Sequence, residues 1–330
     1  MDAIQKKVKH IIESESEFLY NFVTHMPDKQ RNVGVLGLLP FLSVYVDGVA
    51  KWSIVALKKS NPLNKEEKQV YSAIRQGIKL FENDISTNIS IIRNEMAIHE
   101  EAFLTEFFGD IICNEHIIGN TYLTGIYINI TKLREIYKFD FDAKMLMYGN
   151  DTLNKLLKNT AVVGGKIIGL HAVRKNNLYF RKLEIEQNDM FIFDNSVYKI
   201  ASYSDLCWLN LLCQINYVIY FLNMLTDNKD IFVFRCAYIV YYYALKIINS
   251  TDCEIFAENK WADASFRNAL AHYGIKTALG ENKLISGDAF AGLTNYFFDL
   301  SYDDLYENIV NELFSISSQL EEKYIAKPKA

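Results

Sequence analysis

The chain has 330 residues, of which 50% are hydrophobic, 14% are aromatic and only four are proline. This composition excludes extensive disorder and supplies a large core, in one elaborate domain or two. The formal net charge of −5 excludes a protein that coats nucleic acid through bulk positive charge, so any contact with nucleic acid requires a local basic patch.

Helical periodicity dominates the first zone, residues 1–118. Ile4, Val8, Ile11 and Leu19 recur at helical spacing. A long apolar segment follows over residues 33–57, and the sequence Asn-Lys-Glu-Glu at residues 64–67 is typical of a helix start. Residues 1–118 are therefore predicted to form an N-terminal helical domain.

The pattern changes over residues 119–203, which are predicted to form an α/β or β-rich insert. Residues 166–173 and 178–185 flank the sequence Arg-Lys-Asn-Asn and predict a β-hairpin. The sequence Val162-Val163-Gly164-Gly165 is expected to form the turn that leads into this hairpin. Residues 190–195 and 197–201 are further candidate strands.

Residues 204–330 return to a helical pattern. Apolar segments cover residues 207–225 and 232–248, and an amphipathic helix is predicted from Tyr302 to about Tyr324. Asp303 and Asp304 place negative charge in the first turn of this last helix, where the helix dipole favours it. The expected fold class is mainly α, with helical bundles and a smaller, hairpin-containing β-rich middle segment.

Three apolar stretches have to be distinguished from transmembrane helices, namely residues 33–57, 207–225 and 231–248. Each is interrupted by polar or charged residues, among them Asp47, Lys51 and Arg235, so buried bundle helices are expected rather than membrane spans. The N-terminus lacks the apolar core of a signal peptide. We therefore predict a cytoplasmic protein that makes no membrane contact.

Two short phrases each place an arginine and an asparagine ahead of a histidine. They are Arg267-Asn268-Ala269-Leu270-Ala271-His272 and Arg93-Asn94-Glu95-Met96-Ala97-Ile98-His99. A fixed cation, an amide and a titratable imidazole can together act on a phosphodiester without a metal. The sequence contains no Cys-x-x-Cys motif or His/Cys cluster, so neither a metal nor another cofactor is expected.

The sequence Phe-Arg-Asn-Ala-Leu-Ala-His-Tyr, which contains Arg267 and His272, resembles the signature of HEPN-domain proteins. In that family an arginine and a histidine are separated by four to six residues within a bundle of long helices. The resemblance covers the C-terminal helical zone and, less closely, the N-terminal one, but not the middle segment. It implies helical bundles of HEPN type and the activity of a metal-independent endoribonuclease.

The resemblance also implies a role for each residue of the second phrase. His272 would take the proton of a ribose 2′-hydroxyl or give one to the leaving 5′-oxygen. Arg267 would hold the scissile phosphate, and Asn268 would orient the phosphate or the imidazole. The expected product is a 2′,3′-cyclic phosphate, and the expected partners are RNA, a second copy of the chain in a homodimer, and an antitoxin or other regulatory protein.

Helix geometry limits what one phrase can do alone. In a regular helix, Arg267 and His272 would point roughly 140° apart, and Arg93 and His99 about 120° apart. Neither pair shares one helix face. We therefore expect a complete site to be a cleft between two copies of the phrase, either within one chain or across a dimer.

The two histidines differ in their neighbours. His99 continues an apolar stripe through Ile92, Met96 and Phe103, so a structural role for His99 is the alternative to a catalytic one. The neighbours of His272 are small and leave room for a ligand, namely Ala269, Ala271 and Gly274. Residue context therefore favours the second phrase.

A landing surface for RNA is predicted on the expected hairpin, where basic residues alternate with aromatic ones. The candidate residues are Arg174, Lys175, Tyr179, Arg181 and Lys182. The alternative is a solvated hairpin that packs Tyr179 or Phe180 inward.

Three functional hypotheses remain at this level. The first is a ribonuclease of HEPN type that acts as a toxin or antiviral effector. The second is a catalytically inactive HEPN-like protein that binds RNA or a protein partner. The third is a helical scaffold in which the two phrases occur by chance.

Overall fold

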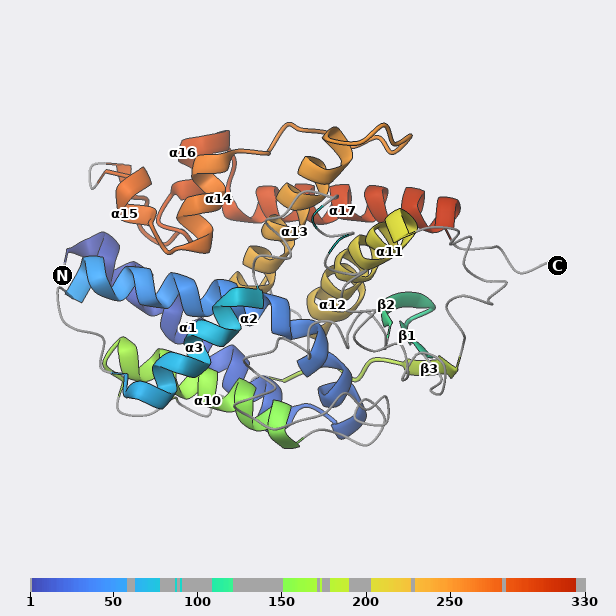
Figure 1. Ribbon diagram of the computed structural model, residues 1–330. Coiled ribbons are helices and arrows are strands. Elements are labelled where there is room, and N and C mark those ends of the chain that lie inside the picture. Colours follow the sequence, from blue (N-terminus) through green and yellow to red (C-terminus); the bar gives the residue numbers. More distant parts are fainter. Residues whose placement is uncertain are drawn as a thin grey trace.

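The computed structural model describes residues 2–57, 63–77, 87, 90, 109–120, 151–170, 173, 179–189, 203–226, 229–280 and 283–324. Helices dominate these residues, and their few strands form one small antiparallel sheet. The mainly α fold predicted from the sequence is therefore confirmed. The first helix begins and the last helix ends at opposite sides of the molecule in Figure 1.

A first layer of helices comes from the N-terminal zone and the middle segment. Its members are α1 (Ala3–His25), α2 (Asp28–Leu57), α3 (Lys65–Gly77) and α10 (Asp151–Ile167), and they pack on one another. The Asp2 side chain begins α1 by accepting a hydrogen bond from the Gln5 amide at 2.8 Å. The predicted apolar stripe of α1 is buried in the core, as its spacing requires.

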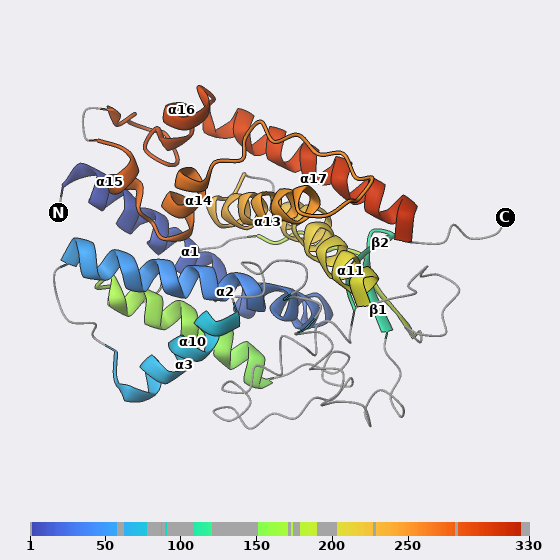
Figure 2. The same ribbon diagram turned by 45° about the horizontal axis from the view of Figure 1, so that its top comes forward.

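A second layer comes from the C-terminal zone and lies above the first in Figure 1. Its long helices are α13 (Ile231–Asn249), α17 (Tyr302–Tyr324) and a continuous helical run made of α11 (Tyr203–Asn216), the π-helical turn η1 (Tyr217–Leu222) and α12 (Asn223–Leu225). The short helices α14 (Ala264–Ala271), α15 (Ile275–Ala278) and α16 (Leu293–Phe298) gather at the end nearest the N-terminus, as Figures 1 and 2 both show. The predicted final helix matches α17 closely.

One hydrophobic core joins the two layers. Phe18 of α1 lies 5.1 Å from Phe232 of α13, measured between ring centroids, and Phe22 lies 6.4 Å from Phe221 of η1. Buried residues of both helical zones belong to the same cluster. The two zones therefore stabilise each other through shared apolar contacts.

The sheet is built from β1 (Gly109–Cys113), β2 (His116–Asn120) and β3 (Ile185–Asp189), in the order β2-β1-β3. β1 and β2 form a hairpin whose turn residues Asn114 and Glu115 adopt φ values of 48° and 70°. This hairpin lies mostly within residues 1–118, which the sequence predicted to be helical. The helical prediction was wrong here. It overlooked a local hairpin signal, the two Ile-Ile pairs at residues 111–112 and 117–118 on either side of Asn114-Glu115.

The turn predicted at residues 162–165 and the β-hairpin predicted over residues 166–185 are also wrong, because residues 162–167 belong to α10 and, among the described residues of the second predicted strand, only Ile185 lies in a strand, β3. The glycines of the predicted turn serve helix packing instead of chain reversal. A Cβ atom on Gly164 would lie 1.8 Å from the hydroxyl oxygen of Tyr45, so only glycine lets α10 approach α2 this closely. The candidate strands at residues 190–195 and 197–201 lie outside the described residues.

Cytoplasmic localisation, expected from the sequence, is contradicted by three helices that are long and apolar enough to cross a membrane. They cover Asp28–Leu57, Cys207–Leu225 and Ile231–Asn249, and their mean hydropathies are 1.8, 1.2 and 1.6. The first of them lies near the N-terminus. Within the fold, 89%, 72% and 78% of the most apolar 18-residue segment of these three helices, in the same order, is buried. The sequence interpretation gave too much weight to single charges, because Asp47 and Arg235 are each paired with an opposite charge. The helices are compatible with membrane association.

Candidate functional site

The second phrase lies on α14, a short helix held firmly at its start. Asp263 caps the helix by accepting a hydrogen bond from the Phe266 amide at 2.7 Å. Phe266 is fully buried and packs edge-on against Tyr238 of α13, with 4.7 Å between ring centroids. These contacts fix α14 against the long helix α13.

The helix ends at His272 in a Schellman turn. The Gly274 amide donates to the Ala269 carbonyl at 2.9 Å, and the Tyr273 amide donates to the Leu270 carbonyl at 3.5 Å. Tyr273 has a φ of 50°, in the left-handed region where glycine is the usual residue. A tyrosine holds this conformation only when its side chain gains compensating contacts.

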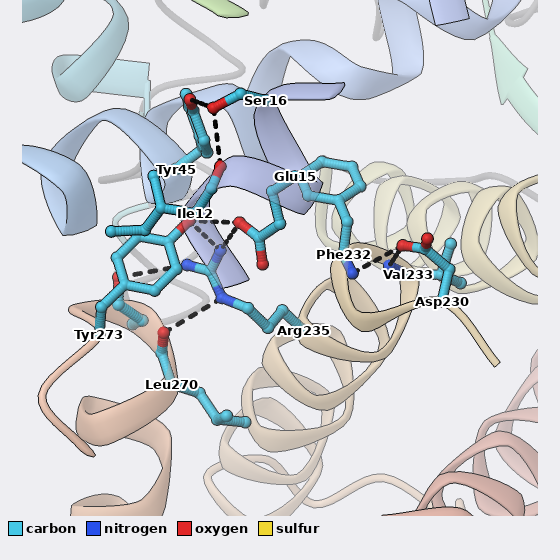
Figure 3. A network of polar contacts seen from close by, with 11 residues as sticks. Ile12, Glu15, Ser16, Tyr45, Asp230, Phe232, Val233, Arg235, Leu270 and Tyr273 are labelled. Atoms are coloured by element: carbon cyan, nitrogen blue, oxygen red, sulfur yellow. Dashed lines mark hydrogen bonds and ion pairs between the residues drawn. The ribbon is translucent and has the colours of Figure 1, made fainter. Parts of the chain in front are cut away.

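Those contacts come from a buried polar network beneath the turn, drawn in Figure 3. The Tyr273 hydroxyl donates to the Glu15 carboxylate, and Arg235 donates through Nη1 to the same carboxylate. The Arg235 guanidinium lies 4.1 Å from the centre of the Tyr273 ring, and its Nε donates to the Leu270 carbonyl at 3.1 Å. The network therefore ties α1, α13 and the end of α14 together.

Both charged members of this network are inaccessible to water. Glu15 is 1% exposed and Arg235 is 2% exposed. Burial raises the pKa of Glu15, while Arg235 and Tyr273 act in the opposite direction. Removing either charge alone would leave its partner buried and uncompensated, which would strongly destabilise the fold.

A glycine on α2 brings that helix next to the same turn. A Cβ atom on Gly48 would lie 2.6 Å from the Ala271 carbonyl oxygen and 2.7 Å from the Tyr273 ring. Because Gly48 places no side chain between α2 and this turn, two residues near Gly48 on the same side of α2 reach His272. These residues are Asp47 and Lys51.

Asp47, Lys51 and His272 form a compact charged cluster. Oδ2 of Asp47 lies 3.1 Å from Nδ1 of His272 and 2.8 Å from Nζ of Lys51. The Lys51 ammonium lies 3.1 Å from Nε2 and 3.3 Å from Nδ1 of the ring. Such nearly equal distances place the ammonium over the ring, because a cation in line with one nitrogen would be much farther from the other. The Asp47 side chain is 6% exposed and that of His272 is 28% exposed.

The cluster opens into a cavity of about 400 Å³ between four helices. Its wall is formed by Gln5 of α1, by Lys51, Trp52 and Val55 of α2, by Ser265, Asn268 and Ala269 of α14, and by residues 272–274 and 276–278 around α15. The cavity therefore combines both helical zones of one chain.

Only part of the predicted second phrase meets at this cavity. His272 and Asn268 line it, whereas Arg267 does not belong to its wall. The guanidinium of Arg267 instead lies 5.2 Å and 5.4 Å from the ring centres of Tyr242 and Tyr243 on α13. Arg267 and His272 contact different elements, in keeping with the large angle between them on the helix.

Of the remaining predicted site residues, none that the structure describes lies on the cavity wall. Arg93, Asn94, His99, Arg174 and Lys175 lie outside the described residues. Tyr179 is 77% exposed, and Arg181 and Lys182 are exposed as well. The neighbouring Phe180 is buried against Phe18 and Phe22, as the alternative interpretation expected for one of the two aromatic residues.

Asp47 and Lys51 are the site residues that sequence reasoning missed. They were considered only as interruptions of an apolar stretch. Two opposite charges four residues apart on an otherwise apolar, buried helix were the available signal, because such charges persist in a core only with partners. The partner, His272, lies 221 residues after Lys51 and is found only from the fold.

In the part of the chain that the structure describes, no group of three or more His, Cys, Asp or Glu side chains is arranged to hold a metal ion. Comparisons with protein-family models, with curated proteins and with solved structures gave no match. The function is therefore inferred from the geometry of this site.

Proposed function

We propose that this protein is a metal-independent endoribonuclease of HEPN type that acts as a toxin or antiviral effector. The supporting observation is the cluster of Asp47, Lys51 and His272, whose Lys51 and His272 lie on the wall of a cavity of about 400 Å³. An oriented imidazole can act as the general base of RNA transesterification, and the Lys51 cation and the Asn268 amide can stabilise the charge that develops on the phosphate.

The His272 imidazole is the general base. Because Nδ1 faces the Asp47 carboxylate at 3.1 Å, Nδ1 carries the proton and Nε2 accepts one. Nε2 removes the proton of the ribose 2′-hydroxyl, whose oxygen attacks the adjacent phosphorus. The bond from phosphorus to the 5′-oxygen breaks, and a 2′,3′-cyclic phosphate forms.

Lys51 takes the role that the resemblance gives to Arg267. Its ammonium stabilises the charge that grows on the phosphate oxygens and gives a proton to the leaving 5′-oxygen. After the product leaves, His272 loses its extra proton to water and Lys51 regains one from water, which restores both groups. Arg267 stays in its place on Tyr242 and Tyr243.

One observation favours the second candidate function, a catalytically inactive HEPN-like protein that binds RNA or a protein partner. Arg267, the cation of the family signature, packs on two tyrosine rings and is not part of the cavity wall. Under this alternative, the cavity binds without cleaving.

Cleavage of RNA in the presence of EDTA tests the proposal. Full-length wild-type protein should cut single-stranded RNA and leave 2′,3′-cyclic phosphate and 5′-hydroxyl ends. The His272→Ala variant should be slower by about 10²- to 10⁴-fold, and its expression should be less toxic. Correctly folded wild-type protein that binds RNA but leaves it intact would establish the second candidate instead.

A further inference from the structure

The last turn of α2 exposes two large apolar side chains beside the cavity. Ile54 is 67% exposed and Val55 is 58% exposed, and Val55 also lines the cavity. Among the described residues, no other two exposed large apolar side chains are neighbours in the sequence. Single exposed apolar residues are common on protein surfaces, but a pair beside a cavity indicates a surface that makes contacts.

The same side of α2 carries a cation of the site. Lys51 precedes Ile54 by three residues and Val55 by four, so the three side chains lie on one helix face, one turn apart. Lys276 of α15 supplies a second cation to the cavity wall. The opening of the cavity therefore combines aliphatic side chains with ammonium groups.

This surface presents positive charge, although both lysines have acidic partners. The Lys51 side chain is 42% exposed, whereas that of Asp47 is 6% exposed. The Lys276 side chain is 46% exposed, whereas that of its partner Asp2 is 21% exposed. None of the described residues that line the cavity is an aspartate or a glutamate. The charge of this surface therefore favours an anionic partner.

The aliphatic pair favours a lipid surface over RNA as that partner. Single-stranded RNA contacts proteins through its phosphates and through bases that stack on aromatic side chains, and neither contact requires isoleucine or valine. Anionic lipids match both kinds of residue, because their headgroups attract lysines and their acyl chains take up aliphatic side chains. Since 89% of the most apolar 18-residue segment of α2 is buried in the fold, the contact is one of docking at the membrane surface.

We propose that the end of the molecule formed by the last turn of α2 and by α15 docks on an anionic lipid surface, with Ile54 and Val55 among the acyl chains and Lys51 and Lys276 at the headgroups. Figures 1 and 2 show both elements at the end where α1 begins. Val55 is both exposed and part of the cavity wall, so docking covers the opening and keeps RNA from His272. This regulation, unlike the docking itself, rests on the proposed ribonuclease function.

Sedimentation of the full chain with lipid vesicles measures the docking. Vesicles of phosphatidylcholine with about 30% phosphatidylserine should bind the wild type at least about tenfold more tightly than vesicles of phosphatidylcholine alone. Ile54→Gln combined with Val55→Gln removes the apolar pair and should weaken binding to the anionic vesicles by about tenfold or more. Because both positions are exposed, this double variant should unfold at the same urea concentration as the wild type.

Phe256→Gln is the matched control. Phe256 is 72% exposed, and its amide donates to Oε1 of Gln319 near the end of α17, on the opposite side of the molecule from the start of α1 in Figure 1. This variant should bind the anionic vesicles as the wild type does. Wild-type protein that stays in solution with anionic vesicles would overturn the docking, as would unchanged binding in the double variant or an equal loss in Phe256→Gln.

RNA cleavage with and without anionic vesicles tests the regulation separately. The vesicles should slow the wild type by at least about tenfold, and should slow the double variant much less relative to its own rate without vesicles. Docking without any RNA cleavage contradicts the ribonuclease and keeps the docking, while cleavage that vesicle-bound protein carries out at full rate contradicts the regulation. If the wild type ignores vesicles and the double variant loses affinity for RNA, the surface belongs to RNA and the proposal is wrong.

Discussion

Two histidine–carboxylate pairs in this protein differ in what surrounds them. His272 lies 3.1 Å from Asp47, and His116 lies 2.9 Å from Glu321. Their side chains are almost equally exposed, at 28% and 29%. His116, however, stacks on Tyr220 with 3.5 Å between ring centroids, whereas His272 has Lys51 over its ring and opens into the cavity.

The second carboxylate is also committed elsewhere. The Glu321 oxygen that contacts His116 accepts a further hydrogen bond from Asn216 at 3.0 Å. Asp47, by contrast, shares its oxygen with a cation that can act on a substrate. The comparison shows that a histidine–carboxylate pair alone does not indicate a functional site. The pair at His272 is a candidate because a cation lies beside it, a cavity opens next to it and buried contacts fix its backbone. His116 thus provides an internal control for His272.

The largest expected effect concerns the network that fixes the backbone at His272. Glu15→Ala leaves Arg235 buried without its carboxylate, so the free energy of unfolding should fall by about 3–5 kcal/mol. Glu15→Leu combined with Arg235→Met removes both charges and should restore most of that stability. Urea denaturation measures both. If the double variant folds stably and cleaves RNA at the wild-type rate, the network does not position His272.

The next effect concerns the two cations near α14. Lys51→Met should slow RNA cleavage by about 10²- to 10³-fold, because the growing phosphate charge loses its stabilising ammonium. Arg267→Met should slow it less than about tenfold, since Arg267 packs on tyrosine rings away from the cavity. Initial rates under single-turnover conditions distinguish the two variants. The reverse order would return the phosphate-binding role to Arg267.

A smaller effect concerns α13, the helix that carries Arg235. Asp230 caps this helix by accepting from the Phe232 amide at 2.7 Å, and burial raises its pKa from 3.8 to about 6. Folding therefore makes Asp230 easier to protonate than it is in the unfolded chain. The stability that protonated Asp230 contributes is complete below pH 3.8 and is lost as the pH rises through 6.

Asp230→Asn keeps a good helix cap and removes this titration. Between about pH 4 and pH 7, the wild type should lose about 2 kcal/mol of unfolding free energy relative to the variant, a figure reduced for partial exposure of the side chain. Urea denaturation of both proteins across this range checks the trend. Parallel curves would show that Asp230 does not titrate in this interval.

The smallest effect concerns the control pair. Glu321→Gln removes one charge of a partly exposed pair and keeps a hydrogen-bonding side chain, so stability should change by less than about 1 kcal/mol. RNA cleavage should be unchanged, because Glu321 is not part of the cavity wall. A large loss of cleavage would mean that the two pairs act together.

Local sequence patterns predicted the elements whose signals lie within the element itself. The apolar repeat of α1 and the acidic first turn of α17 are examples, since each follows from helix geometry alone. The glycines at 164 and 165 were misread as a turn because the same residue serves chain reversal and close helix packing. Only the position of Tyr45 distinguishes the two uses.

The candidate site was predicted in part for the same reason. His272 and Asn268 lie in one phrase and both reach the cavity, but the phrase could not show that Arg267 turns toward α13. Asp47 and Lys51 enter the site through a packing contact at Gly48, which depends on how two distant helices meet. The location of the protein was misjudged because paired charges were counted as isolated ones.

The contrast between the two histidines is tested most directly by the rate of RNA cleavage in EDTA for His272→Gln and His116→Gln. Both substitutions remove an imidazole and keep a polar side chain, and circular dichroism verifies the fold of each. The His272 variant should be slower by at least about 10²-fold, and the His116 variant should remain within about threefold of the wild type. Equal rates for the two variants would contradict the assignment of His272 as the general base.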